Sequence, residues 1–270
     1  MTPTRVALLG VSGRMGRSLV HAIHEGTDYE LAGALASADS PALGADAGEV
    51  AGLGRRLGVL VTADRASALA SADVALDFTV AAAVGANLAA CVARGCALLI
   101  GTTGLDGVLK AAIDAAAARI ALVEAPNTSL GVNLLAQLVA QAAASLPPEY
   151  DIEILEAHHR YKVDAPSGTA LHIGGIIADA LGRKLDDCAV YGREGVTGER
   201  KAATIGFATV RGGDIVGEHT VMFAGPGERV EIVVRSNSRA TYAQGALRAA
   251  RFLTGKKSGL FDMQDVLGLR

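Results

Sequence analysis

Hydrophobic positions in the first half of the chain form short apolar runs separated by longer segments with helical spacing. The short runs are typical of buried parallel strands and cover residues 6–9, 31–35, 73–78, 97–101 and 120–123. Segments of helical spacing lie at residues 15–23, 81–94 and 105–119. Alternating strands and helices predict a parallel sheet that is covered by helices on both faces.

The pattern changes near Asn127. A long helix is expected over residues 129–146, where Pro147 and Pro148 end it. Strands then follow one another at residues 151–157, 203–211, 215–223 and 229–236, before a last helix at 242–254. Gly212 and Gly213 have the turn chemistry of a hairpin between two of these strands. The second half therefore predicts an α+β unit with a mainly antiparallel sheet.

Composition narrows the class of protein. The 270 residues are half hydrophobic and one fifth charged, which is ordinary for a globular protein, and their number fits one large domain or two modest ones. The net charge of −3 argues against nucleic acid as a partner. Cys91, Cys96 and Cys188 are too scattered for a disulfide framework or a zinc site, which favours a reducing compartment. With neither a signal-peptide pattern nor a long apolar run, we expect a cytoplasmic protein that does not enter a membrane.

A glycine-rich segment, GVSGRMG, follows the first expected strand and opens the first helix. Such a turn lets backbone N–H groups at a helix N-terminus approach a pyrophosphate. The predicted cofactor-binding residues here are Gly10, Val11, Ser12, Gly13, Arg14 and Met15. The alternative is an ordinary tight turn.

The second expected strand gives information on the cofactor. It runs into Ala36 and Ser37, and the nearest acid, Asp39, comes too late to hold the ribose hydroxyls of NAD. Arg14 could face a 2′-phosphate instead. The expected cofactor is therefore NADPH or NADH, and use of both fits the residues.

Two further loops follow apolar strands and are candidates for the nicotinamide end of the cofactor. They contain the small or polar residues Gly101, Thr102 and Thr103, and then Ala125, Pro126, Asn127 and Thr128. Loops at the carboxyl ends of parallel strands line the ligand-binding crevice of such folds. Ordinary connecting loops are an equally open alternative.

The densest cluster of chemically active side chains is the segment EAHHRYKVD at residues 156–164. His158, His159, Arg160 and Lys162 crowd positive charge together, which favours an anionic ligand. A solvated basic loop is the alternative. A metal site is less favoured, because adjacent histidines on a strand point apart.

The next residues, APSGTA, open another helix at Ser167, Gly168 and Thr169. The unpaired N–H groups of a helix start bind carboxylates or phosphates, although simple capping would explain Ser167 equally well. Beside the basic cluster, this helix start predicts a site for a small dianionic substrate. Ser167 lacks the setting of a serine nucleophile.

The segment EAHHRYKVDAPSGTA resembles the signature of the dihydrodipicolinate reductase family, the 4-hydroxy-tetrahydrodipicolinate reductases of bacterial lysine biosynthesis. The resemblance covers essentially the whole chain. It also includes GRMGR at 13–17, DFT at 77–79, GTTG at 101–104, YGREGVTGER at 191–200, IGFATV at 205–210, GEH at 217–219 and GLFD at 259–262.

This resemblance implies a Rossmann-like dinucleotide-binding domain at residues 1–127 and a substrate-binding and tetramerisation domain at 128–238. A C-terminal segment, 239–270, would return to the first domain. The implied reaction is NAD(P)H-dependent reduction of 4-hydroxy-tetrahydrodipicolinate to tetrahydrodipicolinate with loss of water, by a homotetramer that binds a small dicarboxylate substrate. His158 matches the family's acid/base residue and Lys162 its proton donor, while His159, Gly168 and Thr169 match positions that bind substrate carboxylates.

The chain departs from the family pattern at four positions. Many members carry an acid and a basic residue where this chain has Ala36 and Ser37. Some have an aromatic residue at Thr128 or a third histidine at Tyr161. The first departure leaves the choice of cofactor open.

Two other readings compete with this one. One is another two-domain dehydrogenase, acting on diaminopimelate or aspartate semialdehyde, although the three cysteines lack the setting that the semialdehyde enzyme needs. The other is a dinucleotide-sensing module, which would have no use for His158, Lys162 and the helix start together.

Overall fold

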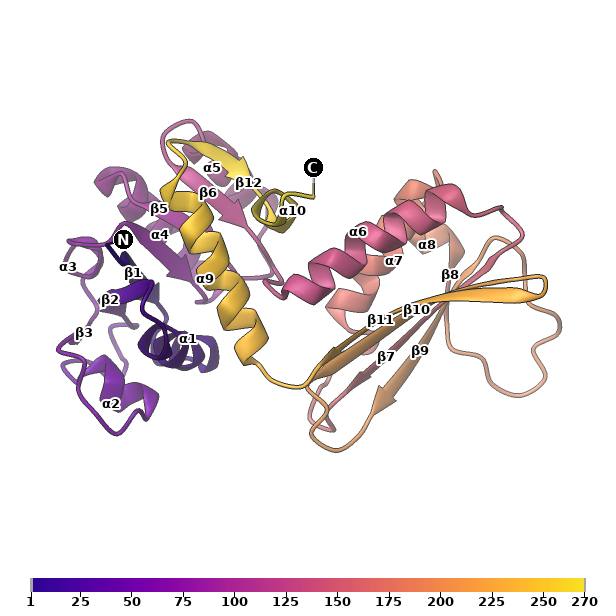
Figure 1. The fold of residues 1–270 in the computed structure, drawn as a ribbon, viewed down its shortest axis with the longest axis horizontal. Coiled ribbons are helices and arrows are strands. Elements are labelled where there is room, and N and C mark those ends of the chain that lie inside the picture. The colour runs from indigo at the N-terminus through magenta and orange to yellow at the C-terminus, as the bar shows by residue number, and fades with distance from the viewer. Residues whose placement is uncertain (1, 270) are drawn as a thin grey trace. The chain divides into compact units, whose positions relative to one another are not determined.

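The computed structural model describes residues 2–269, which divide into two compact units. One unit combines the described residues up to Leu130 with those from Ala240 onward, and the other is Gly131–Arg239 (Figure 1).

The first unit contains a seven-stranded parallel sheet. Its strands are β1 (Thr4–Leu9), β2 (Tyr29–Leu35), β3 (Val61–Thr62), β4 (Val74–Asp77), β5 (Ala97–Ile100), β6 (Ala121–Glu124) and β12 (Gly259–Phe261). Their order is β12-β6-β5-β4-β1-β2-β3. The chain runs from β1 toward β2 on one side and toward β4 on the other, so the strand order reverses at β1. Ligands of open α/β sheets bind at such a switch point, beyond the carboxyl ends of the strands.

Helices cover both faces of this sheet, as the alternating pattern predicts. The helices of the unit are α1 (Arg14–Glu25), α2 (Ala47–Ala51), α3 (Arg65–Leu69), α4 (Ala81–Arg94), α5 (Gly107–Ala116), α9 (Ala240–Thr254) and α10 (Met263–Leu267). Val6 and Leu8 of β1 pack in one core with residues of α1, α9 and α10, whereas Ala7 and Leu9 pack in a second core with α3, α4 and α5. The fold class predicted for this half is confirmed.

The second unit is an α+β structure with a five-stranded mixed sheet. Its elements are α6 (Leu130–Ser145), β7 (Asp151–His158), α7 (Gly168–Ala180), α8 (Leu185–Cys188), β8 (Ala189–Tyr191), β9 (Ile205–Arg211), β10 (Gly217–Gly225) and β11 (Glu228–Ser236). In the order β11-β10-β7-β9-β8, β10 is antiparallel to both of its neighbours, while β7, β9 and β8 are parallel.

The hairpin predicted at Gly212 and Gly213 is wrong. β7 lies between β9 and β10, so the turn crosses over the end of β7 instead of joining adjacent strands. The N–H of Gly212 donates to the carbonyl of His158 (3.0 Å), and the N–H of Arg160 donates to the carbonyl of Gly213 (3.2 Å). Turn residues specify a reversal of direction and do not specify which strands pair. The crossing fixes the turn to the segment that carries the candidate site.

One face of the five-stranded sheet is covered by α6 and α7 (Figure 1). Alternate residues of β7 point to this face, and all four are buried: Ile152, Ile154, Glu156 and His158. The first two join the hydrophobic core, while the last two place an acid and an imidazole at the end of the same face. On the opposite face, Leu155 is 42 % exposed.

Several properties concern the described residues as a whole. Between residues 2 and 269, no helix is long and apolar enough to cross a membrane. In the same range, no group of three or more His, Cys, Asp or Glu side chains is placed to hold a metal ion. All three cysteines are buried free thiols.

Candidate active site

The loop between β1 and α1 has a geometry that only glycine permits at two positions. Gly10 has a φ of +90°, and a β-carbon on Gly16 would lie 2.3 Å from the carbonyl oxygen of Gly10. The first glycine therefore makes the tight turn, and the second lets α1 pack directly on the loop. Gly13 is the N-cap of α1 and offers no capping side chain, so the first amides of this helix fit an external anion.

The other predicted residues of this loop divide between anchors and exposed groups. The N–H groups of Gly10 and Val11 both donate to the carbonyl of Leu35 at the end of β2, which fixes the loop. Val11 is fully buried, whereas Gly13 and Arg14 are exposed at the helix start. Ser12 and Met15 are half-buried.

The loop after β5 packs against the end of β4. A β-carbon on Gly101 would lie 2.2 Å from the ring of Phe78, so glycine is required there. The hydroxyl of Thr102 donates to Asp77 (3.2 Å), a fully buried carboxylate that also accepts from the amide of Thr79 (2.9 Å). Thr103 is exposed. Asp77 thus holds the loops after β4 and β5 in place, a role that the sequence analysis did not predict for it.

The loop after β6 is tied to the same edge. The N–H of Ala125 donates to the carbonyl of Ile100, and the side chain of Asn127 accepts from the amide of Ser129. Thr128 is buried, with its hydroxyl donating to the carbonyl of Tyr242 in α9 (2.7 Å). Pro126 is exposed. Since β1, β4, β5 and β6 are neighbouring parallel strands, the predicted cofactor loops lie along one edge of the sheet.

The end of β2 has no acidic side chain. Ala36 is buried and its N–H donates to the carbonyl of Thr62, while Ser37 and Asp39 are exposed. A hydrogen bond from Ser37 lowers the pKa of Asp39, which is therefore an ionised surface carboxylate.

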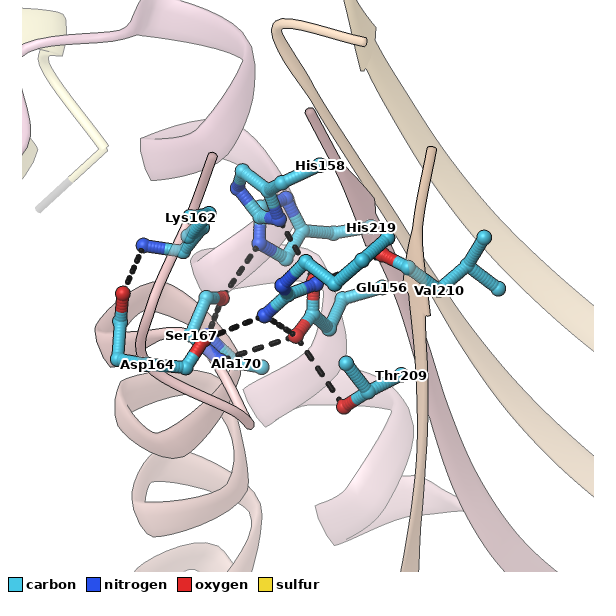
Figure 2. Close-up of polar contacts among 10 residues, drawn as sticks. Glu156, His158, Lys162, Asp164, Ser167, Ala170, Thr209, Val210 and His219 are labelled. Atoms are coloured by element: carbon cyan, nitrogen blue, oxygen red, sulfur yellow. Dashed lines mark hydrogen bonds and ion pairs between the residues drawn. The ribbon is translucent and has the colours of Figure 1, made fainter. Parts of the chain in front are cut away.

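In the second unit, strand register brings together side chains that lie far apart in the sequence. Glu156 of β7 lies opposite Thr209 of β9 and His219 of β10, and His158 lies opposite Arg211. Residues opposite one another in a sheet share a face. The start of α7 adds Ser167 to this group (Figure 2).

Glu156 is at the centre of the cluster and is only 2 % exposed. Arg211 contacts both of its oxygens, with Nη1 donating to Oε2 (2.8 Å) and Nη2 to Oε1 (2.7 Å). His158 Nδ1 lies 2.6 Å from Oε2. Burial alone would raise the pKa of Glu156, but the hydrogen bonds from Arg211 and His158 outweigh burial and hold it at about 2. The carboxylate is therefore ionised at neutral pH.

Two histidines meet beside this carboxylate. The rings of His158 and His219 pack edge to face with centroids 5.2 Å apart. Burial lowers the pKa of His158, and the charges of Lys162 and Arg211 lower it further against the opposing effect of Glu156. Burial lowers the pKa of His219 to about 4, with a further contribution from His158. Both imidazoles are consequently neutral near pH 7.

Ser167 connects His219 to the start of α7. Its hydroxyl lies 3.2 Å from His219 Nε2 and accepts the N–H of Ala170 (3.1 Å), so Ser167 is the N-cap of the helix. Its own N–H donates to Glu156 Oε1 (3.0 Å). With 1 % exposure, Ser167 holds the helix start in place from inside the protein.

Lys162 is held by an acidic neighbour. Its Nζ lies 2.7 Å from Asp164 Oδ1, and this ion pair lowers the pKa of the Asp164 carboxyl, which the amide of Gly168 also stabilises. Arg211 Nη2 donates to the carbonyl of Asp164 (2.6 Å). The loop that carries Lys162 is thereby fixed to the strand that carries Arg211.

The remaining predicted residues surround this cluster. His159 packs against Tyr161, and its buried Nδ1 has no hydrogen-bond partner among residues 2–269. Arg160 is exposed, Gly168 is exposed and Thr169 half-buried in the first turn of α7. The structure thus places His158, Lys162 and Ser167 in one group.

Sequence reasoning missed the partners of this group. Arg211, Thr209 and His219 are more than 40 residues from His158 along the chain, and only strand register reveals them. Glu156 could have been found, because residues two apart on a strand share a face.

The first unit has a parallel sheet with a glycine-rich loop between its first strand and helix, and the second presents a buried acid–imidazole pair beside a lysine. This combination is typical of a pyridine-nucleotide-dependent oxidoreductase. Comparison with known proteins makes the class specific. The family models "Dihydrodipicolinate reductase, N-terminus" and "Dihydrodipicolinate reductase, C-terminus" match residues 4–128 and 131–267. The chain therefore belongs to the dihydrodipicolinate reductase family.

Individual relatives are similar to this chain over its full length. The 4-hydroxy-tetrahydrodipicolinate reductase of Burkholderia ambifaria is 58 % identical over 98 % of this chain and 100 % of its own. That of Herminiimonas arsenicoxydans is 56 % identical over 100 % of both chains. Among solved structures, the dipicolinate-bound dihydrodipicolinate reductase from Paenisporosarcina sp. TG-14 is similar with a TM-score of 0.79 at 25 % identity, covering 97 % of this chain and 98 % of its own.

Proposed function

We propose that the chain reduces 4-hydroxy-tetrahydrodipicolinate to tetrahydrodipicolinate with loss of water, in the biosynthesis of diaminopimelate and lysine. Full-length relatives named for this reductase support the reaction. The structural observation that carries the proposal is the grouping of His158, Lys162 and the start of α7 around one buried carboxylate. Substrate, hydride and one proton give the product and one water.

The cofactor would lie on the first unit, held by the loops at the carboxyl edge of its sheet. The open amides of the α1 start fit the pyrophosphate, and the loops of Gly101–Thr103 and Ala125–Thr128 would line the nicotinamide end. When bound, the reduced nicotinamide nucleotide supplies the hydride. We propose that both NADH and NADPH serve, because β2 ends without a carboxylate and Arg14 is exposed at the helix start.

The substrate's two carboxylates would be bound by the second unit. The first-turn residues Gly168 and Thr169 offer the positive end of α7, and Lys162 offers an ammonium group. His159 and Arg160 add donors in the same loop. Ser167 contributes indirectly, by fixing the helix start.

The cluster can also move the protons that the reaction needs. Loss of water takes a proton from the ring and requires a proton for the departing hydroxyl group. Neutral His158, whose pKa burial lowers, is suited to accept the ring proton, and the imidazolium so formed can pass it to the hydroxyl group, which leaves as water. Hydride addition makes the ring electron-rich, and the ammonium of Lys162 stabilises this charge and donates a proton.

The direct test is a coupled assay. The unstable hydroxylated substrate is generated in place by its synthase from pyruvate and aspartate semialdehyde, and nicotinamide absorbance is followed with NADH and with NADPH. We expect synthase-dependent oxidation with both nucleotides and its loss in His158→Ala. No oxidation by folded protein that still binds nucleotide would refute the reaction and favour the dinucleotide-sensing module.

We also propose that the chain assembles as a homotetramer through the sheet face that α6 and α7 leave uncovered. Exposed apolar residues lie on this face at Leu155, Val210 and Val233, which are 42, 55 and 38 % exposed. Flanking charges are paired within the chain, as in the Arg235–Glu218 ion pair. Light scattering should give the mass of four chains, and Leu155→Arg should lower it. A monomeric wild-type protein would contradict the assembly.

A cytoplasmic location is proposed on chemical grounds. The three buried thiols are free, which suits a reducing compartment. Localisation of the tagged full chain in its own cells would test this, and an exported protein would contradict it.

A further inference from the structure

We propose that Glu156 is a positioning residue: its carboxylate holds the proton of neutral His158 on Nδ1 and leaves Nε2 as the nitrogen that exchanges a proton with the substrate. The use of Nε2 in turnover rests on the proposed function. The position of the proton is a property of the free protein and can be measured without substrate.

The carboxylate of Glu156 cannot turn away from His158, because both of its oxygens are occupied. Oε1 accepts from the amide of Ser167 (3.0 Å), the hydroxyl of Thr209 (3.2 Å) and Nη2 of Arg211 (2.7 Å). Oε2 accepts from Nη1 of Arg211 (2.8 Å) and faces His158 Nδ1 at 2.6 Å. Two strands, β7 and β9, and the start of α7 thus fix one acceptor toward one ring nitrogen.

Only one neutral tautomer of His158 is compatible with this contact. An ionised carboxylate has no proton to donate, so Nδ1 must carry the hydrogen of the bond. Nε2 makes no hydrogen bond to any residue from 2 to 269 and holds the free lone pair. A hydrogen bond at one imidazole nitrogen generally decides the chemistry available at the other.

The charges around His158 show why an acid is needed at this place. Lys162 from the loop, Arg211 from β9 and His219 from β10 all face the ring, and the first two carry positive charge that disfavours the imidazolium. Asp164 of the loop is paired with Lys162. Glu156 is the negative group in direct contact with His158, so removing its charge leaves the ring among cations.

The Glu156→Gln variant keeps the shape of the side chain but changes both the tautomer and the pKa of His158. An amide can donate to Nδ1 as well as accept from it, so the tautomer is no longer fixed. The imidazolium also loses its counter-charge, which lowers the pKa of His158 further. We expect kcat to fall about tenfold or more while KM changes little, and the acidic limb of the kcat/KM profile to move to lower pH by about one unit.

Glu153→Gln is the matched control for a merely structural effect. Glu153 lies on the same strand, on the opposite face, and Arg193 contacts both of its oxygens (3.0 and 2.9 Å). Its loss also leaves Arg193 without its acid, and among residues 2–269 no hydrogen bond joins Glu153 to a histidine. Glu156→Gln and Glu153→Gln are compared only after light scattering shows that both form assemblies of the same mass. Glu153→Gln should lower stability without moving the pH profile, and Glu156→Asp, which keeps the charge, should restore much of the profile.

Long-range ¹H–¹⁵N spectra of protein labelled at histidine nitrogens measure the tautomer directly, with His158 assigned from its absence in His158→Gln. We expect Nδ1–H in the wild-type protein and in Glu153→Gln, and a mixture of tautomers in Glu156→Gln. Nε2–H in the wild-type protein would overturn the proposal even if the Glu156 variant does not fold. An unchanged tautomer and pH profile in folded Glu156→Gln would overturn it as well. A wild-type protein without turnover would refute the reaction while the spectra still decide the role of Glu156.

Discussion

The ammonium nitrogen of Lys162 lies 2.7 Å from a carboxylate oxygen of Asp164, two residues further along the same loop. The amide of Gly168, at the start of α7, stabilises the same carboxylate. Asp164 therefore occupies the Lys162 ammonium and the Gly168 amide, two of the groups that we propose to bind a carboxylate of the substrate. In the absence of substrate, it gives these groups an internal counter-ion.

This relationship predicts that Asp164 competes with the substrate. Asp164→Asn removes the charge and should lower KM about threefold or more, because Lys162 no longer has to leave an acidic partner. The Kd of pyridine-2,6-dicarboxylate, measured by calorimetry, should fall in the same proportion. Asp186→Asn in α8, an exposed acid outside the cluster, is the control and should change neither constant. A raised KM would show instead that Asp164 holds Lys162 in its working position.

Lys162 itself should act mainly in the chemical step. Lys162→Ala removes the ammonium that meets the developing charge, an interaction that strengthens in the transition state. We expect kcat to fall about 100-fold or more in the coupled assay, with a smaller change in KM. Raised KM with unchanged kcat would assign Lys162 to binding alone.

The lowered pKa values of the buried acid and histidines predict how the free energy of unfolding depends on pH. The pKa of His219 is lowered from 6.5 to about 4 in the folded protein. As the pH falls from 6.5 to 4, His219 therefore binds a proton in the unfolded chain before it does so in the folded one. The folded state loses about 3 kcal/mol over that window. Glu156, at about 2 against 4.5, makes a similar contribution that is present above pH 4.5 and is lost as the pH falls toward 2.

Urea unfolding at a series of pH values measures this dependence. His219→Asn should flatten the fall between pH 6.5 and 4, although not completely, because the pKa of His158 is lowered too. An equally steep fall in the variant would mean that His219 does not titrate in that window. The unfolding free energy at pH 8 provides the reference for each protein.

The sequence predicted the parallel sheet because β1, β4, β5 and β6 are runs of buried residues separated by helices of ten or more residues. It missed seven elements that have five residues or fewer and cannot show a period: α2, β3, α3, α8, β8, β12 and α10. Loop residues Gly10 and Gly16 were recognisable because their role is local. The partners of Glu156 were not, since Arg211 and His219 reach it only through the order of strands, and the wrong hairpin at Gly212 shows that local turn chemistry does not determine that order.

Gly16 inside α1 and Gly26 at its C-cap provide a matched test of the predicted cofactor loop. A β-carbon on Gly16 would lie 2.3 Å from the carbonyl of Gly10, whereas one on Gly26, the C-cap of the same helix, would meet nothing closer than 3.6 Å. Gly16→Ala should therefore displace the loop and weaken binding of NADPH about tenfold or more, measured by nucleotide fluorescence. Gly26→Ala should bind like the wild-type protein. Equal affinities in both variants would remove this loop from the cofactor site.

We expect the end of β2 to decide between the two nucleotides. An acid at this position accepts hydrogen bonds from the ribose hydroxyls of NADH and repels the 2′-phosphate of NADPH. Ala36→Asp should therefore lower the ratio of kcat/KM for NADPH to that for NADH by about tenfold or more. Ala38→Asp, two residues further along at an exposed position, adds the same charge beyond the strand end and should change the ratio much less. If both substitutions shift the ratio equally, the general charge of this surface selects the nucleotide, and the end of β2 is not the point of contact.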